Sequence, residues 1–212
     1  MPADPTVTID AADLEPAAAY RLLTGVVVPR PIAWVSTVDE RGVPNLAPFS
    51  AFTMVSNDPP MVGINIGRRG GERKDTARNI HATGEYVVNI ARWDDHELVH
   101  ESSRAMPRGA DEAAELGIRL APADVVRAPR VAHAPVSLEC RFARAVEFGR
   151  GGAEFTVGEI VRFHVLAELL DNGKIDTAAL DPAARIAGPS YSRLGTTRTL
   201  RPVPVALEVP AH

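Results

Sequence analysis

The sequence predicts a mainly β protein, an antiparallel β-barrel with peripheral helices. Six or more segments are rich in β-branched, aromatic and other apolar residues, and short turns join several of them as hairpins. Few helical segments lie between them, whereas a parallel sheet needs a long crossover, usually a helix, between successive strands. The pattern therefore favours a closed or split antiparallel barrel over a βαβ sheet.

Composition narrows the class of protein. The chain has 212 residues, of which 45% are hydrophobic, so it is long enough to bury a core as one domain. Its formal net charge of −4 offers no sequence-wide basic surface for a nucleic acid. The single cysteine, Cys140, excludes an intrachain disulfide or a thiolate metal cluster. The acidic, proline-containing start and the lack of a long apolar run predict a cytoplasmic protein that makes no membrane contact.

The first elements follow from local signals. Residues 16–23 begin with proline, which suits the first turn of a helix, and we expect this helix at the periphery. Residues 32–38 are rich in β-formers, and residues 39–42 (DERG) have turn chemistry. The long, largely apolar run over 43–55 then completes a predicted hairpin.

The middle of the chain alternates between strand and helix. Residues 61–66 form a predicted strand that leads into a basic, glycine-rich loop over 67–73. Residues 75–83 form a predicted helix, and Gly84 suits the left-handed conformation just past its end. Residues 85–91 return to a strand.

The second half predicts a helical cover and a second hairpin. The polar stretch over 93–116 predicts one or two helices outside the sheet. Residues 136–142 and much of 155–165 alternate apolar and polar side chains across the glycine-rich turn at 149–152, so we expect a hairpin. Residues 199–212 contain three prolines and predict an extended tail.

One helix start has the composition of a phosphate site. Lys74 and Thr76 stand at the beginning of the predicted helix, where free backbone N–H groups attract anions. In the alternative interpretation, Asp75 caps the helix while Arg73 and Lys74 are solvated charges. The sequence alone leaves both interpretations open.

Two further candidates are equally open. Residues 45–52 (NLAPFSAF) mix small and hydroxyl residues with apolar ones, so a flat ring could approach the backbone there; an edge or bulged strand would also tolerate Pro48. His164 shares its side of a predicted strand with Ile160 and Arg162, and so need not be a core residue. A lone histidine is nevertheless more often structural than catalytic.

Other chemistries are disfavoured. Only one pair of histidines, His96 and His100, has helical spacing, so we predict no metal site. No nucleophile elbow is present, and Cys140 lies within a predicted strand. The Rossmann and Walker glycine patterns are absent, so a nicotinamide would bind as a passing substrate.

Seven short motifs, taken in order, resemble the flavin reductase-like family that includes the flavoredoxins, and the similarity spans about residues 20–202. The motifs are residues 29–37, 45–52, 74–76 with 79–80, 84–89, 138–140, 158–161 with His164, and 191–195 with 201–202.

The resemblance implies a single domain over 1–212, folded as a Greek-key antiparallel, FMN-binding split β-barrel that forms a homodimer. FMN, or less often FAD, would bind near the subunit interface, with its phosphate on Lys74 and Thr76. His164 would lie on the nicotinamide side, and Tyr191 and Arg193 would border the site. The ring and ribityl chain would be lined by Trp34, Ser36, Thr37, Asn45, Ala47, Pro48, Ser50, Ala51 and Phe52. Many members have two glycines where this chain has Ala187-Gly188.

By the same resemblance, we expect a flavin reductase that passes hydride from NAD(P)H to flavin N5 and serves a flavin-dependent monooxygenase or a redox protein. Two alternatives stay open. One is a flavoredoxin-like electron carrier that takes electrons from a protein donor. The other is a dimeric flavin-binding module without redox work. Since the flavin performs the difficult chemistry, the lack of a catalytic dyad does not separate them.

Overall fold

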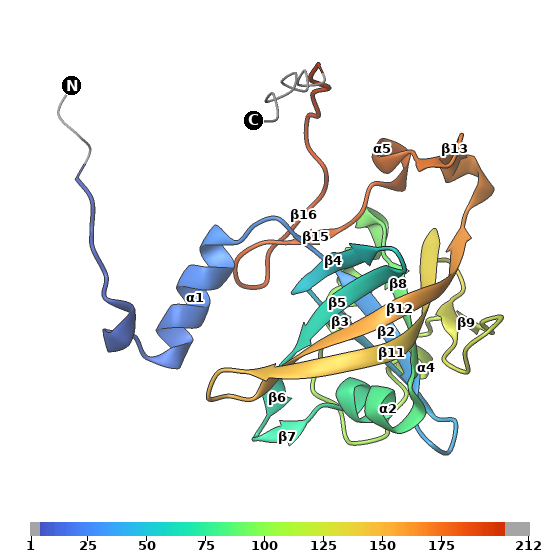
Figure 1. Ribbon diagram of the computed structural model, residues 1–212, viewed down its shortest axis with the longest axis horizontal. Coiled ribbons are helices and arrows are strands. Elements are labelled where there is room, and N and C mark those ends of the chain that lie inside the picture. The colour runs from blue at the N-terminus through green and yellow to red at the C-terminus, as the bar shows by residue number, and fades with distance from the viewer. Residues whose placement is uncertain (1–4, 202–212) are drawn as a thin grey trace, which may run out of the picture.

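A computed structural model describes residues 5–201 and shows one large antiparallel sheet (Figure 1). Seven strands are hydrogen-bonded in the order β3-β2-β8-β11-β12-β5-β4. They are β2 (Ala33–Val38), β3 (Pro44–Phe49), β4 (Phe52–Asn57), β5 (Pro60–Ile66), β8 (Glu85–Ile90), β11 (Val136–Phe148) and β12 (Ala153–Val165). The predicted mainly β, antiparallel fold is confirmed.

The sheet curls around one core. Phe49 on β3, at one end of the strand order, and Ile64 on β5, near the other end, belong to the same buried cluster as Val35, Val88 and Leu138. Side chains from opposite ends of a flat sheet would not meet, so the shared core gives the sheet its barrel form.

Both predicted hairpins are present. In the first, β2 pairs with β3 from Ala33↔Phe49 to Val38↔Pro44, and in the second, β11 pairs with β12 over 13-residue strands. The single run predicted over 43–55 is wrong, because it divides into β3 and β4 at opposite edges of the sheet. A break at residues 50–51 lets β4 pair with β5 instead, and Pro48 is tolerated because β3 is an edge strand.

The two longest helices of the described chain differ in how much of their surface is buried. Helix α1 (Pro16–Val26) begins with the expected proline and runs three residues beyond the predicted end; none of its residues is buried, and Figure 1 shows it projecting from the barrel. Helix α2 (Asp75–Thr83) covers β2 and β3 and ends at Gly84, whose φ of 72° is left-handed, as predicted. Ala77 and Ile80 bury its inner face.

The predicted helical cover over 93–116 is shorter than expected. It consists of η2 (Trp93–Asp95), α3 (His96–Glu101) and α4 (Glu112–Glu115), with irregular backbone between α3 and α4. Trp34 and Leu46 pack against Val99 and Ala113 in a second buried cluster on the outer side of the sheet.

The remaining elements are short. They are η1 (Ala11–Asp13), β1 (Arg30–Pro31), β6 (Arg68–Arg69), β7 (Glu72–Arg73), β9 (Leu120–Ala121), β10 (Arg130–Val131), η3 (Ala167–Leu169), β13 (Leu170–Asp171), β14 (Lys174–Ile175), α5 (Thr177–Leu180), β15 (Ala184–Arg185) and β16 (Tyr191–Ser192). Most of the predicted tail, residues 202–212, lies outside the described residues. Within 5–201, no helix has the length and apolar character needed to cross a membrane.

Candidate functional site

A hollow of about 320 Å³ opens beside the N-terminus of α2. Its walls come from β3, from the start of α2 and from residues 102–112, and its volume falls in the range of small-molecule sites. Six basic and three acidic residues line it. The basic ones are Arg69, Arg73, Lys74, Arg78, Arg104 and Arg108. We call this cavity the main hollow. Its excess of positive charge suits an anionic ligand.

Lys74 is the N-cap residue of α2 and has an unusual environment. Its ammonium lies 5.8 Å from the centroid of the Phe49 ring, and no carboxylate within the described chain forms an ion pair with it. Burial lowers the pKa of Lys74, and the nearby charge of Arg69 lowers it further. An uncompensated cation at a helix N-terminus is the arrangement that a phosphate group stabilises.

The capping alternative is not what the structure shows. Asp75 is the first residue of α2 rather than its cap, and its carboxylate pairs with Arg78 one turn later. The Lys74 side chain makes no capping hydrogen bond. The backbone N–H groups at the start of α2 therefore remain on the side of the main hollow without a side-chain cap.

A buried hydrogen-bond network forms one wall. The Thr76 hydroxyl donates to Asn45 Oδ1 at 2.8 Å, and Asn45 Nδ2 donates to Glu112 Oε2 at 2.9 Å. The Leu46 N–H donates to the same carboxylate oxygen at 3.0 Å. This network joins α2, β3 and α4. Sequence reasoning missed Glu112, because a carboxylate at the start of a short helix carries no signal of a long-range partner.

The same wall carries a loop that is fixed at both ends, residues 103–111, which we call the clamped loop. Before it, the Trp34 indole N–H donates to the Ser102 hydroxyl at 2.9 Å, in a buried contact. After it, Glu112 is held by Asn45 and by Leu46. Ser103, Arg104, Met106 and Arg108 of the clamped loop line the main hollow. The loop thus brings two arginines to the site on a span with firm anchors.

A smaller hollow of about 160 Å³ continues from the main one, with which it shares Pro48 and Ser103. Tyr191 lines it, and the Tyr191 hydroxyl accepts a hydrogen bond from Arg185 Nη1 at 2.5 Å. Burial raises the pKa of Tyr191. Ser50 lines the same hollow and accepts a bond from Arg30 Nε at 3.4 Å. The two hollows together form a trough, with the six basic residues of the main hollow at one end and two tyrosines and two arginines at the other.

About half of the predicted site residues line the trough. Seven of them line it: Asn45, Ala47, Pro48, Ser50, Lys74, Thr76 and Tyr191. These residues come from strands and helices far apart in the sequence, and they suit a long ligand with a phosphate at one end.

Trp34, Ser36 and Thr37, which the resemblance places along the ligand, do not line the trough. All three are fully buried, and their polar atoms bond to other parts of the protein. Ser36 donates to the carbonyl of Pro129, and Thr37 accepts from Asn79. The reason is that β2 is buried along its whole length, with the barrel core on one face and the second cluster on the other.

Three other predicted residues lie outside the trough. Ala51 is exposed at the bend between β3 and β4, and Phe52 packs on the barrel core. Arg193 pairs with Asp181 and lies over the Trp93 ring, 5.9 Å from its centroid.

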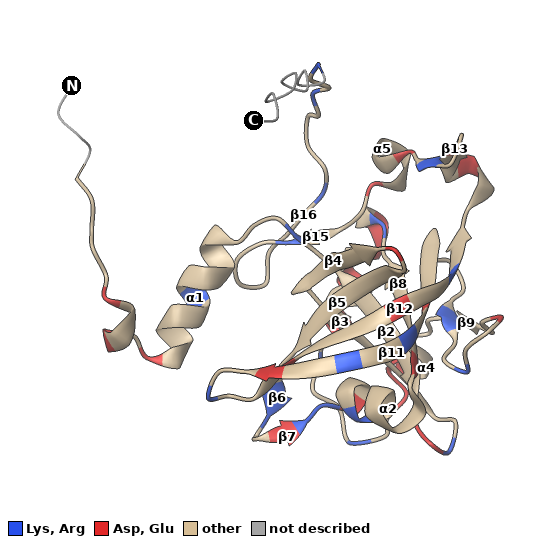
Figure 2. Ribbon diagram, in the orientation of Figure 1, with Lys and Arg blue, Asp and Glu red and all other residues tan. Residues whose placement is uncertain are grey.

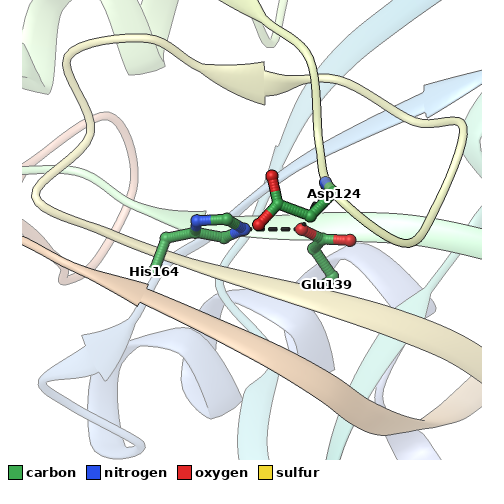
Figure 3. A group of neighbouring side chains, drawn as sticks. All are labelled: Asp124, Glu139 and His164. Carbon is green, nitrogen blue, oxygen red and sulfur yellow. Dashed lines mark hydrogen bonds and ion pairs between the residues drawn. The ribbon is translucent and has the colours of Figure 1, made fainter.

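His164 is also placed elsewhere, as Figure 3 shows. Its Nε2 lies 2.5 Å from Oε1 of Glu139, and it lines neither hollow of the trough. The Glu139 carboxylate accepts backbone N–H groups of residues 124–126, and Asp124 pairs with Arg162 at 2.9 Å. Burial would raise the pKa of Glu139, but these hydrogen bonds hold it below its ordinary value. The pair therefore joins β11 and β12 to the loop that precedes β11 instead of reaching the site.

Comparisons with known proteins find similar sequences and similar structures. The model of the flavin reductase like domain matches residues 25–179. An uncharacterised protein of Halalkalibacterium halodurans is 40% identical over 186 residues, which cover 85% of this chain and 89% of that protein.

Two solved structures are also similar. Nitrilotriacetate monooxygenase component B from Bacillus cereus is 33% identical, with a TM-score of 0.90, and the match covers 93% of this chain and all of that one. A flavin reductase with a split barrel domain from Shewanella frigidimarina is 22% identical, with a TM-score of 0.80 and coverage of 91% and 96%. The second likeness concerns the fold alone, and it confirms the predicted split barrel.

Proposed function

This chain belongs to the flavin reductase-like family, and from that membership and the trough we propose that it binds FMN and reduces it with NAD(P)H. The observation that carries the proposal is Lys74, a half-buried cation at the N-terminus of α2 that forms no ion pair with any residue of 5–201. A partly desolvated charge without a partner is costly, and a phosphate would offset that cost.

Different residues of the trough would bind different parts of the cofactor. Lys74 and the first N–H groups of α2 would bind the phosphate, and Phe49, Ala47 and Pro48 would give an apolar wall. The network of Thr76, Asn45 and Glu112 keeps that wall in place. When bound, the flavin supplies the hydride chemistry at N5. The protein's own contribution is to bind it, orient it and leave one face open for a second planar ring.

The electron donor and acceptor follow from the same site. We expect NAD(P)H to bind as a passing substrate, because the described fold has no dinucleotide-binding βαβ unit. The acceptor that we favour is a partner flavin-dependent monooxygenase. The likeness to the monooxygenase component of Bacillus cereus supports this choice. The alternative, a flavoredoxin-like carrier, differs in taking electrons from a protein.

We also propose that the protein is a homodimer. Helix α1 projects from the barrel with Leu23 and Val26 exposed by 60% and 73%, and the edge strand β4 exposes Met54 by 87% (Figure 1). Apolar side chains on a projecting helix and an unpaired strand edge suit burial against a second copy. Light scattering should give twice the chain mass, and Leu23→Glu with Val26→Glu should give a monomer. Val7→Glu, at another exposed apolar residue, is the control; a monomeric unmodified protein would contradict the proposal.

An anaerobic absorbance titration tests the reductase activity. The protein is mixed with FMN, the spectrum is recorded from about 300 to 550 nm, and NADH and NADPH are added separately. Bleaching of a bound-flavin band by either nucleotide supports the reductase. A band that only dithionite bleaches favours the electron carrier. A failure to bind FMN at all would overturn both.

A further inference from the structure

Glu154, the second residue of β12, is a buried carboxylate next to the segment that precedes Lys74. Its Oε1 lies 2.5 Å from Nε of Arg73, and its Oε2 lies 2.7 Å from Nε2 of His81. Burial would raise the pKa of Glu154, but the hydrogen bonds from Arg73 and His81 hold it below its ordinary value. Glu154 is therefore an anion at neutral pH, and one side chain, that of Arg73, separates it from the main hollow.

The same carboxylate lies between two like charges. In the hairpin of β6 and β7, Arg68 and Arg73 are direct cross-strand partners, and like charges in that position repel each other. Nη2 of Arg68 lies 3.6 Å from Oε1 of Glu154, the oxygen that also bonds to Arg73. Figure 2 shows the basic residues of this hairpin. Glu154 thus supplies the countercharge for a hairpin that leads directly into Lys74.

This pairing determines what Arg73 contributes to the main hollow. Arg73 lines that hollow, yet its guanidinium is bonded to a carboxylate of the protein. The hydrogen bond to Glu154 also raises the pKa of Arg73. A second carboxylate, Glu147, is exposed, lies 4.0 Å from Nη2 of Arg73 and already bonds to Arg68 at 2.6 Å. Without Glu154, Arg73 would therefore be available to a phosphate, whose oxygens suit a guanidinium group.

We propose that Glu154 limits the affinity of the main hollow for phosphate by occupying Arg73 as an internal counter-anion. Glu154 is a positioning residue, because it acts through Arg73 and lines neither hollow of the trough. The inference rests on the proposed function, in which Lys74 binds the phosphate of FMN. The free positive charge of the main hollow is then smaller than its six basic residues suggest, because Arg73 is paired with Glu154 and Arg78 with Asp75.

A ratio of two dissociation constants measures this effect. FMN and riboflavin share the ring and the ribityl chain, and only FMN has the phosphate, so the Kd of riboflavin divided by that of FMN reports on the phosphate alone. Both constants come from quenching of flavin fluorescence. Glu154→Gln keeps the shape of the side chain and removes its charge, so the ratio should rise about tenfold, as one added charge-assisted hydrogen bond allows. Glu159→Gln, at an exposed glutamate of the same strand, should leave the ratio unchanged.

Further substitutions test whether Arg73 carries the effect. Glu154→Gln combined with Arg73→Gln should return the ratio to that of the unmodified protein, because the freed cation is gone. Glu154→Asp keeps the charge, so the ratio should not rise. Arg73→Gln alone should lower the ratio far less than Lys74→Ala does, since Arg73 is bonded to Glu154 and not to the ligand. This last variant tests the inference even if Glu154→Gln does not fold.

Three results would overturn the inference. One is a folded Glu154→Gln variant whose ratio is unchanged or lower, and equal weakening of FMN and riboflavin is a case of this kind. Another is a double variant that keeps the raised ratio. The third is a loss in Arg73→Gln as large as that in Lys74→Ala, which would show that Arg73 itself binds the phosphate. An unmodified protein that binds neither flavin overturns the proposed function, and this inference with it.

Discussion

The imidazole Nε2 of His164 lies 2.5 Å from Oε1 of Glu139, a carboxylate with no solvent exposure. The same carboxylate accepts three backbone N–H groups from residues 124–126. The contact therefore joins the barrel strands to the loop that follows β9. Its consequences concern stability and pH rather than flavin chemistry.

The pKa of Glu139 is held below its ordinary value of 4.5, so its contribution to stability is present above that pH. The contribution is lost as the pH falls through the lowered pKa. Glu139→Gln should decrease the free energy of unfolding at pH 7 by about 1.5–3 kcal/mol, the range for hydrogen bonds to charged groups. Urea denaturation at pH 7 and pH 4 measures this. The variant should also lose less stability on acidification, and an acid dependence equal to that of the unmodified protein would refute the assignment.

Lys74→Ala should weaken FMN binding by about 1.5–3 kcal/mol, since it removes a charged donor from the phosphate. The readout is the dissociation constant from flavin fluorescence. The chain's other lysine, Lys174, lies exposed in β14, and Lys174→Ala is the matched control. Equal FMN affinities for the two variants would contradict the prediction that Lys74 binds the phosphate.

Glu112→Ala should release one end of the clamped loop, because it leaves Asn45 Nδ2 and the Leu46 N–H without their acceptor. Each unsatisfied buried group costs about 1–3 kcal/mol. We expect a lower melting temperature and faster amide exchange over residues 103–111. Glu115→Ala changes the same helix at an exposed pair with Arg104 and should alter neither. Unchanged exchange in the Glu112 variant would show that the loop is held in another way.

Gly158→Ala should destabilise the barrel, because a Cβ there would lie 2.2 Å from the Tyr86 hydroxyl oxygen. Overpacking of this kind costs about 1–3 kcal/mol. Thermal unfolding measures the effect. Gly151→Ala, where no atom lies within 4 Å of the added carbon, should be close to neutral. If the two variants melt at the same temperature, the close approach of β12 to Tyr86 does not require a glycine at position 158.

Local signals predicted much of the fold. The end of α2 at Gly84 and the hairpin of β11 and β12 were predictable, because left-handed glycine and period-two alternation act within a few residues. The division of residues 43–55 into β3 and β4 was not, since it depends on pairing with β5. For the same reason Lys74 could be proposed from its helix start, whereas Glu112 could not, because its partner lies 67 residues away.

The burial of β2 shows that a family motif does not by itself reveal which side chains of a strand are accessible to a ligand. Its residues are part of a segment that resembles the family, yet Ser36 and Thr37 have hydroxyls directed to protein partners. A strand covered on both faces shows no alternation from which its exposed side could be read.

The clamped loop can change in sequence while the contacts that anchor it stay the same. Its anchors, the Trp34–Ser102 and Glu112–Asn45 contacts, lie outside residues 103–111, and the barrel core contains none of those residues. Substitutions between the anchors therefore alter the charge facing the hollows at little cost to folding. Figure 2 shows how basic and acidic residues are spread over the ribbon around α2. New ligand preferences can arise in this stretch by point mutation while the rest of the gene stays constrained, which makes it the natural target for a randomised library.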